Sequence, residues 1–271
     1  MSKDNRTGRR DILKAGALLG AAAPLALSPL GARAAEDAPA TVIPTPSVTT
    51  LPVVGSDARF PVRRIYCVGR NYLEHIREMG NDERLPPFFF AKHRDMIVQN
   101  GETVIYPTLT HDYQHEIELV VAMKSGGENI PVEEALSHVY GYAVGLDMTR
   151  RDLQIASRSI ERPWEIGKSF EQSAPCAAIT PVEQSGHLSN GHIYLSVNGE
   201  MRQDADLDLL IWNVPEIISQ LSKEVGIGAG DLIYTGTPAG VAAVVAGDVM
   251  IGGIEGLTEL TITVGPRPDR A

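Results

Sequence analysis

Apolar residues along the chain gather in short runs of four to eight positions, broken by Gly, Pro, Asn and Asp. Runs of this length that are rich in Val, Ile, Leu and Tyr predict strands rather than helices. In "HEIELVVAMK" the polar start gives way to an unbroken apolar stretch, which is typical of a strand buried on both faces. The strands expected on this basis lie within residues 63–70, 86–98, 115–124, 139–148, 229–241 and 247–264.

A smaller set of segments has helical or hairpin character. Residues 214–227 repeat apolar positions with a helical period and predict an amphipathic helix. The segment 192–205 alternates around Asn198-Gly199, a pair that favours a two-residue hairpin turn. Short helices are also expected at 71–80, 149–158 and after Pro131. Strands and helices do not alternate regularly, so the pattern predicts a mostly β, α+β fold with helices at its periphery.

The first residues read as a targeting segment. Arg9 and Arg10 precede an apolar, alanine-rich run that ends in the small-residue pattern of residues 32–34, the layout of a twin-arginine export signal. A membrane anchor is the alternative, but Pro24 and Pro29 break the short apolar run and favour removal over stable insertion. We therefore expect a signal peptide at 1–34, a linker or arm at 35–60 and one catalytic domain at 61–265. The expected location is the periplasm, or the cytoplasm if the signal is not used.

Charge and cysteine content narrow the classes of partner. The 271-residue chain has a formal net charge of −10, which argues against nucleic acid or an anionic membrane as a partner. A small anionic substrate would need local positive charge from a metal or from a few placed Lys and Arg side chains. The two cysteines, Cys67 and Cys176, stand in apolar surroundings and are expected to be buried thiols.

Two glutamates at the start of one strand are the first candidate for chemistry. Glu116 and Glu118 are two residues apart, so their side chains share one face of the strand. Asp147 ends another apolar strand, and three such carboxylates would suit Mg²⁺ or Mn²⁺, and less well Ca²⁺. The residues alone leave two points open: the pair can also lie solvated at an exposed strand end, and nothing in the sequence places Asp147 beside it.

Further candidates each have an ordinary alternative. His75 and Glu78 are three residues apart on the expected helix, where they form either a general base with its orienting carboxylate or an exposed ion pair. Lys168, in "GKSF", is either a cation that enters a pocket or a solvated lysine.

The same ambiguity applies to two other motifs. Arg150 and Arg151 would clamp a carboxylate or simply pair with nearby acids. Thr237, in "YTGTPAG", belongs either to an anion-binding turn or to an ordinary turn.

Seven segments taken together resemble the fumarylacetoacetate hydrolase family, in its single-domain form, and within it the acylpyruvate and fumarylpyruvate hydrolase branch. They occur in the family's order and extend over residues 63–264, nearly the whole chain after the expected signal. The segments are "CVGRNYLEHIREMG", "PPFFFAKH", "HEIELVVAM", "VYGYAVGLDMTRRDLQ", "RPWEIGKSFEQSAP", "VNGEMRQD" and "GDLIYTGTPAGV".

The resemblance implies a fold, a set of roles and a reaction. The fold would be a rolled, mixed β-sandwich with peripheral helices, usually a homodimer. The reaction would be metal-dependent hydrolysis of the C–C bond of a 2,4-dioxo acid to pyruvate and a carboxylic acid, as in the breakdown of aromatic compounds. The implied residues are Glu116, Glu118 and Asp147 as ligands of Mg²⁺ or Mn²⁺, His75 and Glu78 as the water-activating pair, Lys168 near the metal, and Arg151, Gln154 and Thr237 on the substrate.

Three functions are compatible with these residues. The first is an acylpyruvate hydrolase. The second is a decarboxylase of oxaloacetate, or an isomerase or decarboxylase of hydroxymuconate-type diacids, at the same metal site. The third is an exported protein that binds an oxo acid without turnover, against which the intact His75–Glu78 pair and Lys168 argue.

Overall fold

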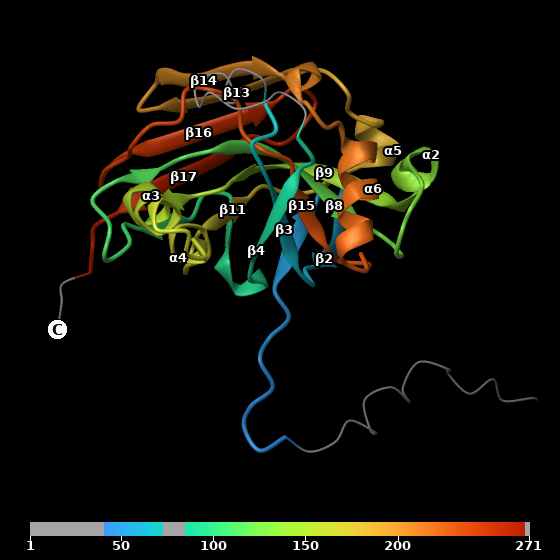
Figure 1. Ribbon diagram of the computed structural model, residues 1–271, viewed down its shortest axis with the longest axis horizontal. Helices are drawn as coiled ribbons and strands as arrows, with labels where there is room; N and C mark the ends of the chain where they lie inside the picture. Colours follow the sequence, from blue (N-terminus) through green and yellow to red (C-terminus); the bar gives the residue numbers. More distant parts are fainter. Residues whose placement is uncertain (1–40, 73–84, 269–271) are drawn as a thin grey trace, which may run out of the picture. The chain divides into compact units, whose positions relative to one another are not determined.

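The computed structural model describes residues 41–72 and 85–268 and divides the chain into two units, Met1–Pro46 and Ser47–Ala271. In the first unit, residues 41–46 are exposed and lie outside any helix or strand. The second unit contains all the elements labelled in Figure 1. Across the described ranges, no helix combines the length and the apolar character needed to cross a membrane.

A large mixed sheet forms the centre of the second unit. Its strands pair antiparallel except for two parallel pairs, β15 with β3 and β11 with β5. In spatial order the strands are β4 (Phe88–Lys92), β3 (Ile65–Gly69), β15 (Leu232–Tyr234), β8 (Ile117–Met123), β9 (Val139–Leu146), β11 (Ala174–Cys176) and β5 (Ile97–Gln99), with β12 (Thr180–Pro181) also paired to β9.

A second sheet of five strands packs on the first. It contains the hairpin predicted at Asn198-Gly199, whose two turn residues have φ values of 52° and 81°. The order is β14 (Glu200–Asp206), β13 (His192–Val197), β16 (Val249–Ile254), β17 (Leu260–Gly265) and β6 (Thr103–Ile105). Two short pairs complete the strands: β10 (Thr149–Arg150) with β7 (Tyr113–Gln114), and β1 (Thr50–Val53) with β2 (Ser56–Pro61).

Strand β8 explains the unbroken apolar run in the sequence. Its odd-numbered residues, such as Leu119 and Val121, join a core shared with β13, β16 and β17 of the second sheet. Two of its even-numbered residues, Val120 and Ala122, join a second core on the opposite face of the sheet. Because both faces are covered, every residue of β8 is buried and period-2 alternation disappears from the sequence.

The helices lie around the sheets, as the mostly β pattern predicts. Figure 1 shows α3 and α4 on one side of the second unit and α2, α5 and α6 on the other. The predicted amphipathic helix is α6, which begins with a capping box between Asn213 and Glu216. The helices are α2 (Val132–Ala135), α3 (Arg151–Ser159), α4 (Glu165–Lys168), α5 (Val182–Ser185) and α6 (Val214–Glu224), with 3-10 turns η1 (Arg94–Met96), η2 (Leu136–His138) and η3 (Leu207–Leu209).

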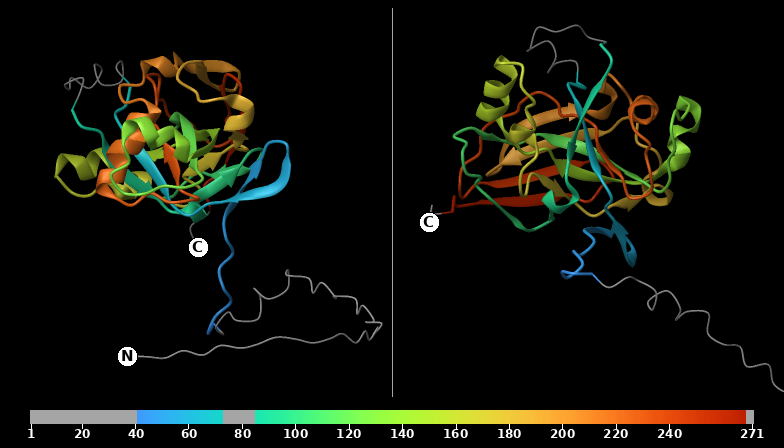
Figure 2. Two further views of the ribbon diagram at one scale, coloured as in Figure 1. Left: turned by 90° about the vertical axis from the view of Figure 1, so that its right-hand side faces the viewer. Right: turned by 60° about the horizontal axis from the view of Figure 1, so that its bottom comes forward.

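The segment expected to be a linker or arm contains the β1–β2 hairpin. Leu51 and Phe60 pack into the second core beside Cys67 and Cys176, so this hairpin belongs to the domain (Figure 2, in blue). Its apolar residues are isolated among Pro, Thr and charged residues, which hides the strands in the sequence. Both cysteines are free and buried, as predicted. Most of the helix expected at 71–80 lies outside the described residues.

Candidate functional site

Three carboxylates that local sequence patterns could not place together meet where β8 and β9 pair. Ile117 lies opposite Leu146, and the Asp147 amide donates to the Glu116 carbonyl at 2.9 Å. Side chains opposite one another on paired strands share a face, so Asp147 joins the two glutamates. Ligand oxygens of Glu116, Glu118 and Asp147 lie within 4.8 Å of one another, and none of the three residues is more than 5% exposed. The exposed-strand-end alternative is therefore wrong.

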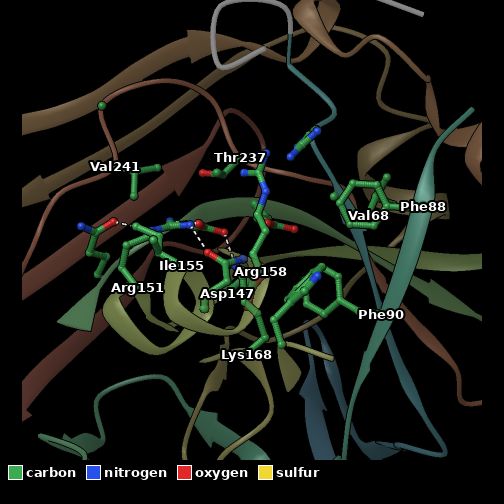
Figure 3. Close-up of a pocket in the computed structure, with 18 residues that line it drawn as sticks. Val68, Phe88, Phe90, Asp147, Arg151, Ile155, Arg158, Lys168, Thr237 and Val241 are labelled. Atoms are coloured by element: carbon green, nitrogen blue, oxygen red, sulfur yellow. Dashed lines mark hydrogen bonds and ion pairs between the residues drawn. The ribbon is translucent and has the colours of Figure 1, made fainter. Parts of the chain in front are cut away.

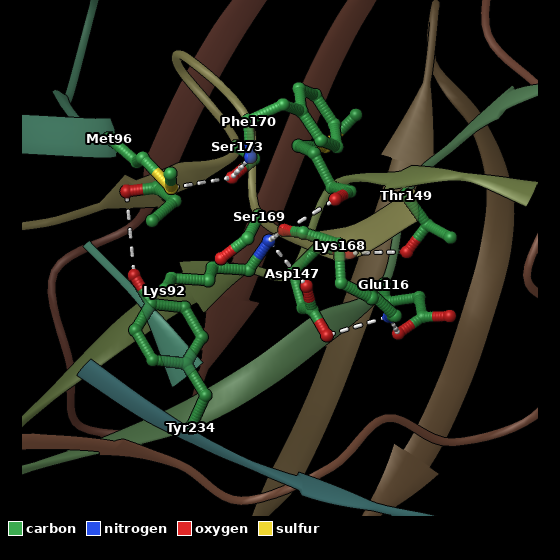
Figure 4. A network of polar contacts seen from close by, with 12 residues as sticks. Lys92, Met96, Glu116, Asp147, Thr149, Lys168, Ser169, Phe170, Ser173 and Tyr234 are labelled. Carbon is green, nitrogen blue, oxygen red and sulfur yellow. Dashed lines mark hydrogen bonds and ion pairs between the residues drawn. The ribbon is translucent and has the colours of Figure 1, made fainter. Parts of the chain in front are cut away.

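Two buried lysines and an arginine surround these carboxylates. Lys168 Nζ lies 2.5 Å from Glu116 Oε2 and 2.6 Å from Asp147 Oδ2. Lys92 Nζ lies 2.8 Å from Asp147 Oδ1 (Figure 4). Arg151 forms an ion pair with Glu116 Oε1. Lys92 had no predicted role, although it stands in the family-like segment "PPFFFAKH", because a lysine near three aromatic residues has no recognisable chemistry alone.

A close approach of two helices places Lys168. Gly167 packs against α3, and a Cβ at this position would lie 2.7 Å from the Cβ of Gln154, closer than side chains tolerate. Glycine therefore lets α4 lie directly on α3 and brings Lys168 under the carboxylates. At the start of α3, Arg151 donates to Gln154 Oε1 at 2.6 Å and to Gln114 Oε1 at 2.8 Å. Of the residues implied to bind substrate, Arg151 thus contacts the carboxylate cluster and Gln154 lies beside Arg151.

The two glutamates differ in their electrostatic surroundings. Burial alone would raise the pKa of Glu116, but Lys168 and Arg151 outweigh it and lower that pKa to about 2. Burial, followed by repulsion from Asp147 and Glu116, raises the pKa of Glu118 well above its usual value. Glu118 makes no ion pair within the described part of the chain and accepts one hydrogen bond, from the Gly236 amide at 2.8 Å.

The site fits a divalent metal ion. Glu118 is a buried carboxylate that lacks a cationic partner among the described residues, and a metal ion would supply the missing positive charge. All three candidate ligands offer oxygen, which suits Mg²⁺ and Mn²⁺ better than a thiophilic metal. Among the residues that the structure describes, no salt bridge explains why a carboxylate is buried at Glu118.

The carboxylates form the floor of a pocket of about 730 Å³. Acidic and basic groups lie at its inner end, and aromatic side chains form one wall (Figure 3). The lining residues are Val68, Gly69, Arg70, Phe88, Phe90, Gln114, Glu116, Glu118, Asp147, Arg151, Gln154, Ile155, Arg158, Trp164, Lys168, Thr237, Gly240 and Val241.

Thr237 is oriented by a glutamine that the sequence did not single out. Gln203 is fully buried; its Oε1 accepts from the Ile117 amide at 3.0 Å and lies 2.9 Å from His115 Nδ1. Its Nε2 donates to Thr237 Oγ1 at 2.8 Å and to the Pro238 carbonyl at 2.9 Å. Because Thr237 Oγ1 already accepts one hydrogen bond, its own proton is free to be donated to a ligand. The only signal for Gln203 in the sequence was the family-like segment "VNGEMRQD".

His75 and Glu78, expected as the water-activating pair, lie outside the described residues. Arg150 does not face this pocket: its guanidinium stacks on the Phe170 ring, with Cζ 4.1 Å from the centroid. Of the two adjacent arginines, Arg151 alone reaches the carboxylates.

Comparisons with known proteins show which family this chain resembles. A family model described as the C-terminal domain of fumarylacetoacetate (FAA) hydrolase matches residues 64–265. Fumarylpyruvate hydrolase of a Ralstonia species is 49% identical over 179 residues, which cover 66% of this chain and 93% of that protein. The mitochondrial oxaloacetate tautomerase of Homo sapiens is 38% identical over 202 residues, 74% of this chain and 91% of that protein.

One of the similar solved structures contains a metal ion and a small oxo acid. The crystal structure of fumarylpyruvate hydrolase from Pseudomonas aeruginosa, in complex with Mn²⁺ and pyruvate, superposes with a TM-score of 0.82 at 51% identity. The match covers 84% of this chain and all of that chain.

Proposed function

The chain belongs to the fumarylacetoacetate hydrolase family, and from this premise we propose that it hydrolyses the C–C bond of an acylpyruvate, with fumarylpyruvate as the leading substrate. Family membership and the acidic triad make it a metal-dependent hydrolase, with Mn²⁺ or Mg²⁺ as the cofactor. The observation that carries the proposal is the buried cluster of three carboxylates at the floor of a pocket, in a chain about half identical to two fumarylpyruvate hydrolases.

A divalent cation held by Glu116, Glu118 and Asp147 would act as a Lewis acid that stabilises negative charge on an α-oxo acid. In the proposed reaction water adds to C4 of the 2,4-dioxo acid and the C3–C4 bond breaks. The electron pair goes to C3, which takes up a proton, so the products are pyruvate and a carboxylic acid. From the family resemblance, we assign proton removal from water to His75, oriented by Glu78.

The described residues supply binding and charge for this reaction. Lys168 remains protonated, because the attraction of Asp147 and Glu116 outweighs burial and raises its pKa. Its fixed ammonium stabilises negative charge that develops on the substrate. The Thr237 hydroxyl can donate to the substrate carboxylate, since Gln203 occupies its acceptor side. Arg151 and Gln154 also line the pocket.

The test is turnover of the purified chain with Mn²⁺ or Mg²⁺, with fumarylpyruvate, acetylpyruvate and oxaloacetate offered separately and pyruvate release recorded. We expect EDTA-sensitive cleavage of the acylpyruvates. The Glu118→Gln variant, which keeps the shape of the side chain, should lose activity, and Glu133→Gln at an exposed position should not. Activity on oxaloacetate alone would favour the decarboxylase or tautomerase alternative, for which the 38% identity to the human tautomerase is the support.

We also propose that the chain is exported by the twin-arginine route and acts as a homodimer. The support for export is the pair Arg9–Arg10 with the apolar run that follows it, and the support for the dimer is the family resemblance. Fractionation of cells that express Arg9→Lys/Arg10→Lys tests export, because this variant should stay in the cytoplasm. Light scattering of the purified protein tests the dimer, which would give twice the mass of one chain.

A further inference from the structure

The pocket carries two arginines that the proposed reaction does not use. Arg70 directly follows β3, and Arg158 lies on α3 seven residues beyond Arg151. Both line the pocket with the metal-site carboxylates (Figure 3, where Arg158 is labelled). Among the described residues, neither guanidinium has an ion pair or a hydrogen bond, whereas Lys92, Lys168 and Arg151 each contact a carboxylate.

The two guanidiniums also act on each other. Burial, and then the positive charge of Arg158, lowers the pKa of Arg70. The two positive charges lie in one pocket and repel each other, although the chain as a whole has a net charge of −10. An anionic ligand bound between them would remove this repulsion. Each guanidinium offers such a ligand paired N–H donors in one plane, an arrangement that binds carboxylates.

The backbone holds Arg70 in an uncommon conformation. Its φ is 59°, in the left-handed region that residues other than glycine seldom adopt. The next residue, Asn71, is buried and fixes the segment with hydrogen bonds to the carbonyls of Trp212 at 2.9 Å and Thr235 at 2.8 Å. Strain that is held in place by buried hydrogen bonds is concentrated at ligand-binding positions.

Aromatic rings connect the inner end of the pocket to Arg70. Lys168 Nζ lies 5.4 Å from the Phe90 ring, which packs 5.1 Å from Trp164; Trp164 packs 5.9 Å from Phe88. The Phe88 ring then lies 5.9 Å from the Arg70 guanidinium. Phe88 and Phe90 are two residues apart on β4, so this wall advances by about 6.6 Å along the strand.

That length matches a particular class of substrate. Fumarylpyruvate has seven carbons in a row, and such an extended chain spans about 7.5 Å from its first to its last carbon. With one end of the substrate at the carboxylate cluster, the other end would reach the level of Phe88 and Arg70. We propose that Arg70 and Arg158 form a subsite for a second carboxylate, at the end of the acyl group, so that the enzyme selects dicarboxylic acylpyruvates. This inference rests on the proposed hydrolase activity.

The experiment compares two substrates of equal length. One is fumarylpyruvate, and the other is its analogue in which a methyl group replaces the distal carboxylate. For the unaltered enzyme we expect kcat/KM to favour the dicarboxylate by about tenfold or more, and Arg158→Gln or Arg70→Gln to lower this ratio about tenfold. Arg94→Gln removes the same charge from an exposed position that does not line the pocket, and it should keep the ratio.

The outcomes separate the two proposals. If the unaltered enzyme cleaves neither substrate, the proposed function is overturned. If it cleaves both and the ratio is the same in the Arg158→Gln, Arg70→Gln and Arg94→Gln proteins, the function stands and the subsite is overturned. Thermal unfolding of each variant shows that it is folded, and product inhibition gives a second readout: fumarate should inhibit the Arg158→Gln enzyme more weakly than the parent.

Discussion

The charged side chains at the inner end of the pocket have partners of opposite charge, and those at the outer end do not have such partners among the described residues. At the inner end, Glu116 and Asp147 are buried and in contact with Lys168, so the charges compensate one another before any ligand binds. At the outer end, Arg70 and Arg158 are more exposed and lack acidic partners among the described residues. The comparison indicates that the inner charges contribute to folding as well as to chemistry, whereas the outer charges serve only a ligand.

Breaking the inner ion pairs should have the largest effect on stability. Lys168→Met leaves Glu116 and Asp147 buried with less positive charge, and we expect the metal-free protein to lose about 3–5 kcal/mol of unfolding free energy. Mn²⁺ should restore part of the loss, because it supplies positive charge at the same place. Urea unfolding with EDTA and with Mn²⁺ measures both. Lys124→Met, at an exposed position, is the control, and a loss below about 1 kcal/mol for Lys168→Met would contradict the assignment.

Substitutions of Glu116 and Glu118 should differ in their effect on stability but both weaken metal binding. Without metal, Glu116→Gln should cost about 1–3 kcal/mol because it weakens contacts with Lys168 and Arg151. Glu118→Gln should cost little or stabilise, since Glu118 has no described cationic partner and the amide oxygen can still accept from Gly236. Both variants should lose more than about a hundredfold in Mn²⁺ affinity by calorimetry. Equal stability losses would show that Glu118 is compensated in the metal-free protein.

Helix α3 joins the two ends, and Asp152 in its first turn anchors it. Its carboxylate accepts from Thr110 Oγ1 at 2.5 Å and from the His111 amide at 2.8 Å. Burial opposes ionisation, but these hydrogen bonds outweigh it and lower the pKa of Asp152. We expect Asp152→Asn to cost about 1 kcal/mol.

The pH dependence of that cost follows from the sign of the shift. A lowered pKa means that the stabilisation is fully present above the unfolded value of 3.8 and is lost as the pH falls through the folded value. Unfolding free energies of parent and variant, measured from pH 6 to pH 3, should therefore differ at pH 6, and the difference should begin to shrink as the pH falls below 3.8. A constant difference over this range would mean that the ionised carboxylate does not anchor the helix.

The smallest effect is expected at the outer end. Arg158→Gln should change the unfolding free energy by less than about 0.5 kcal/mol, because an exposed guanidinium without a described partner contributes little. Arg151→Gln on the same helix is the matched comparison and should cost about 1–3 kcal/mol through its contact with Glu116. Thermal or urea unfolding of the two variants side by side measures this difference. Equal losses of unfolding free energy would show that the charges at the two ends of the pocket contribute equally to stability.

Much of the fold could be predicted from local patterns. The apolar runs gave the strands, Asn198-Gly199 gave a hairpin because both residues tolerate positive φ, and the helical period gave α6. The β1–β2 hairpin was missed, since Leu51 and Phe60 are single apolar residues whose burial depends on the core that covers them. The ligand candidates Glu116 and Glu118 followed from period-2 geometry together with the family-like segments.

The sequence by itself determined the residue types, the shared face of Glu116 and Glu118, and the membership of a recognisable family. Only the tertiary structure showed that Asp147 meets both glutamates and Lys168 meets Glu116, that Lys92 and Gln203 support the site, and that Arg70 and Arg158 lie in one pocket. The reason is physical: contacts between residues far apart in the chain depend on strand register and on the packing of α3 and α4, which no local pattern encodes.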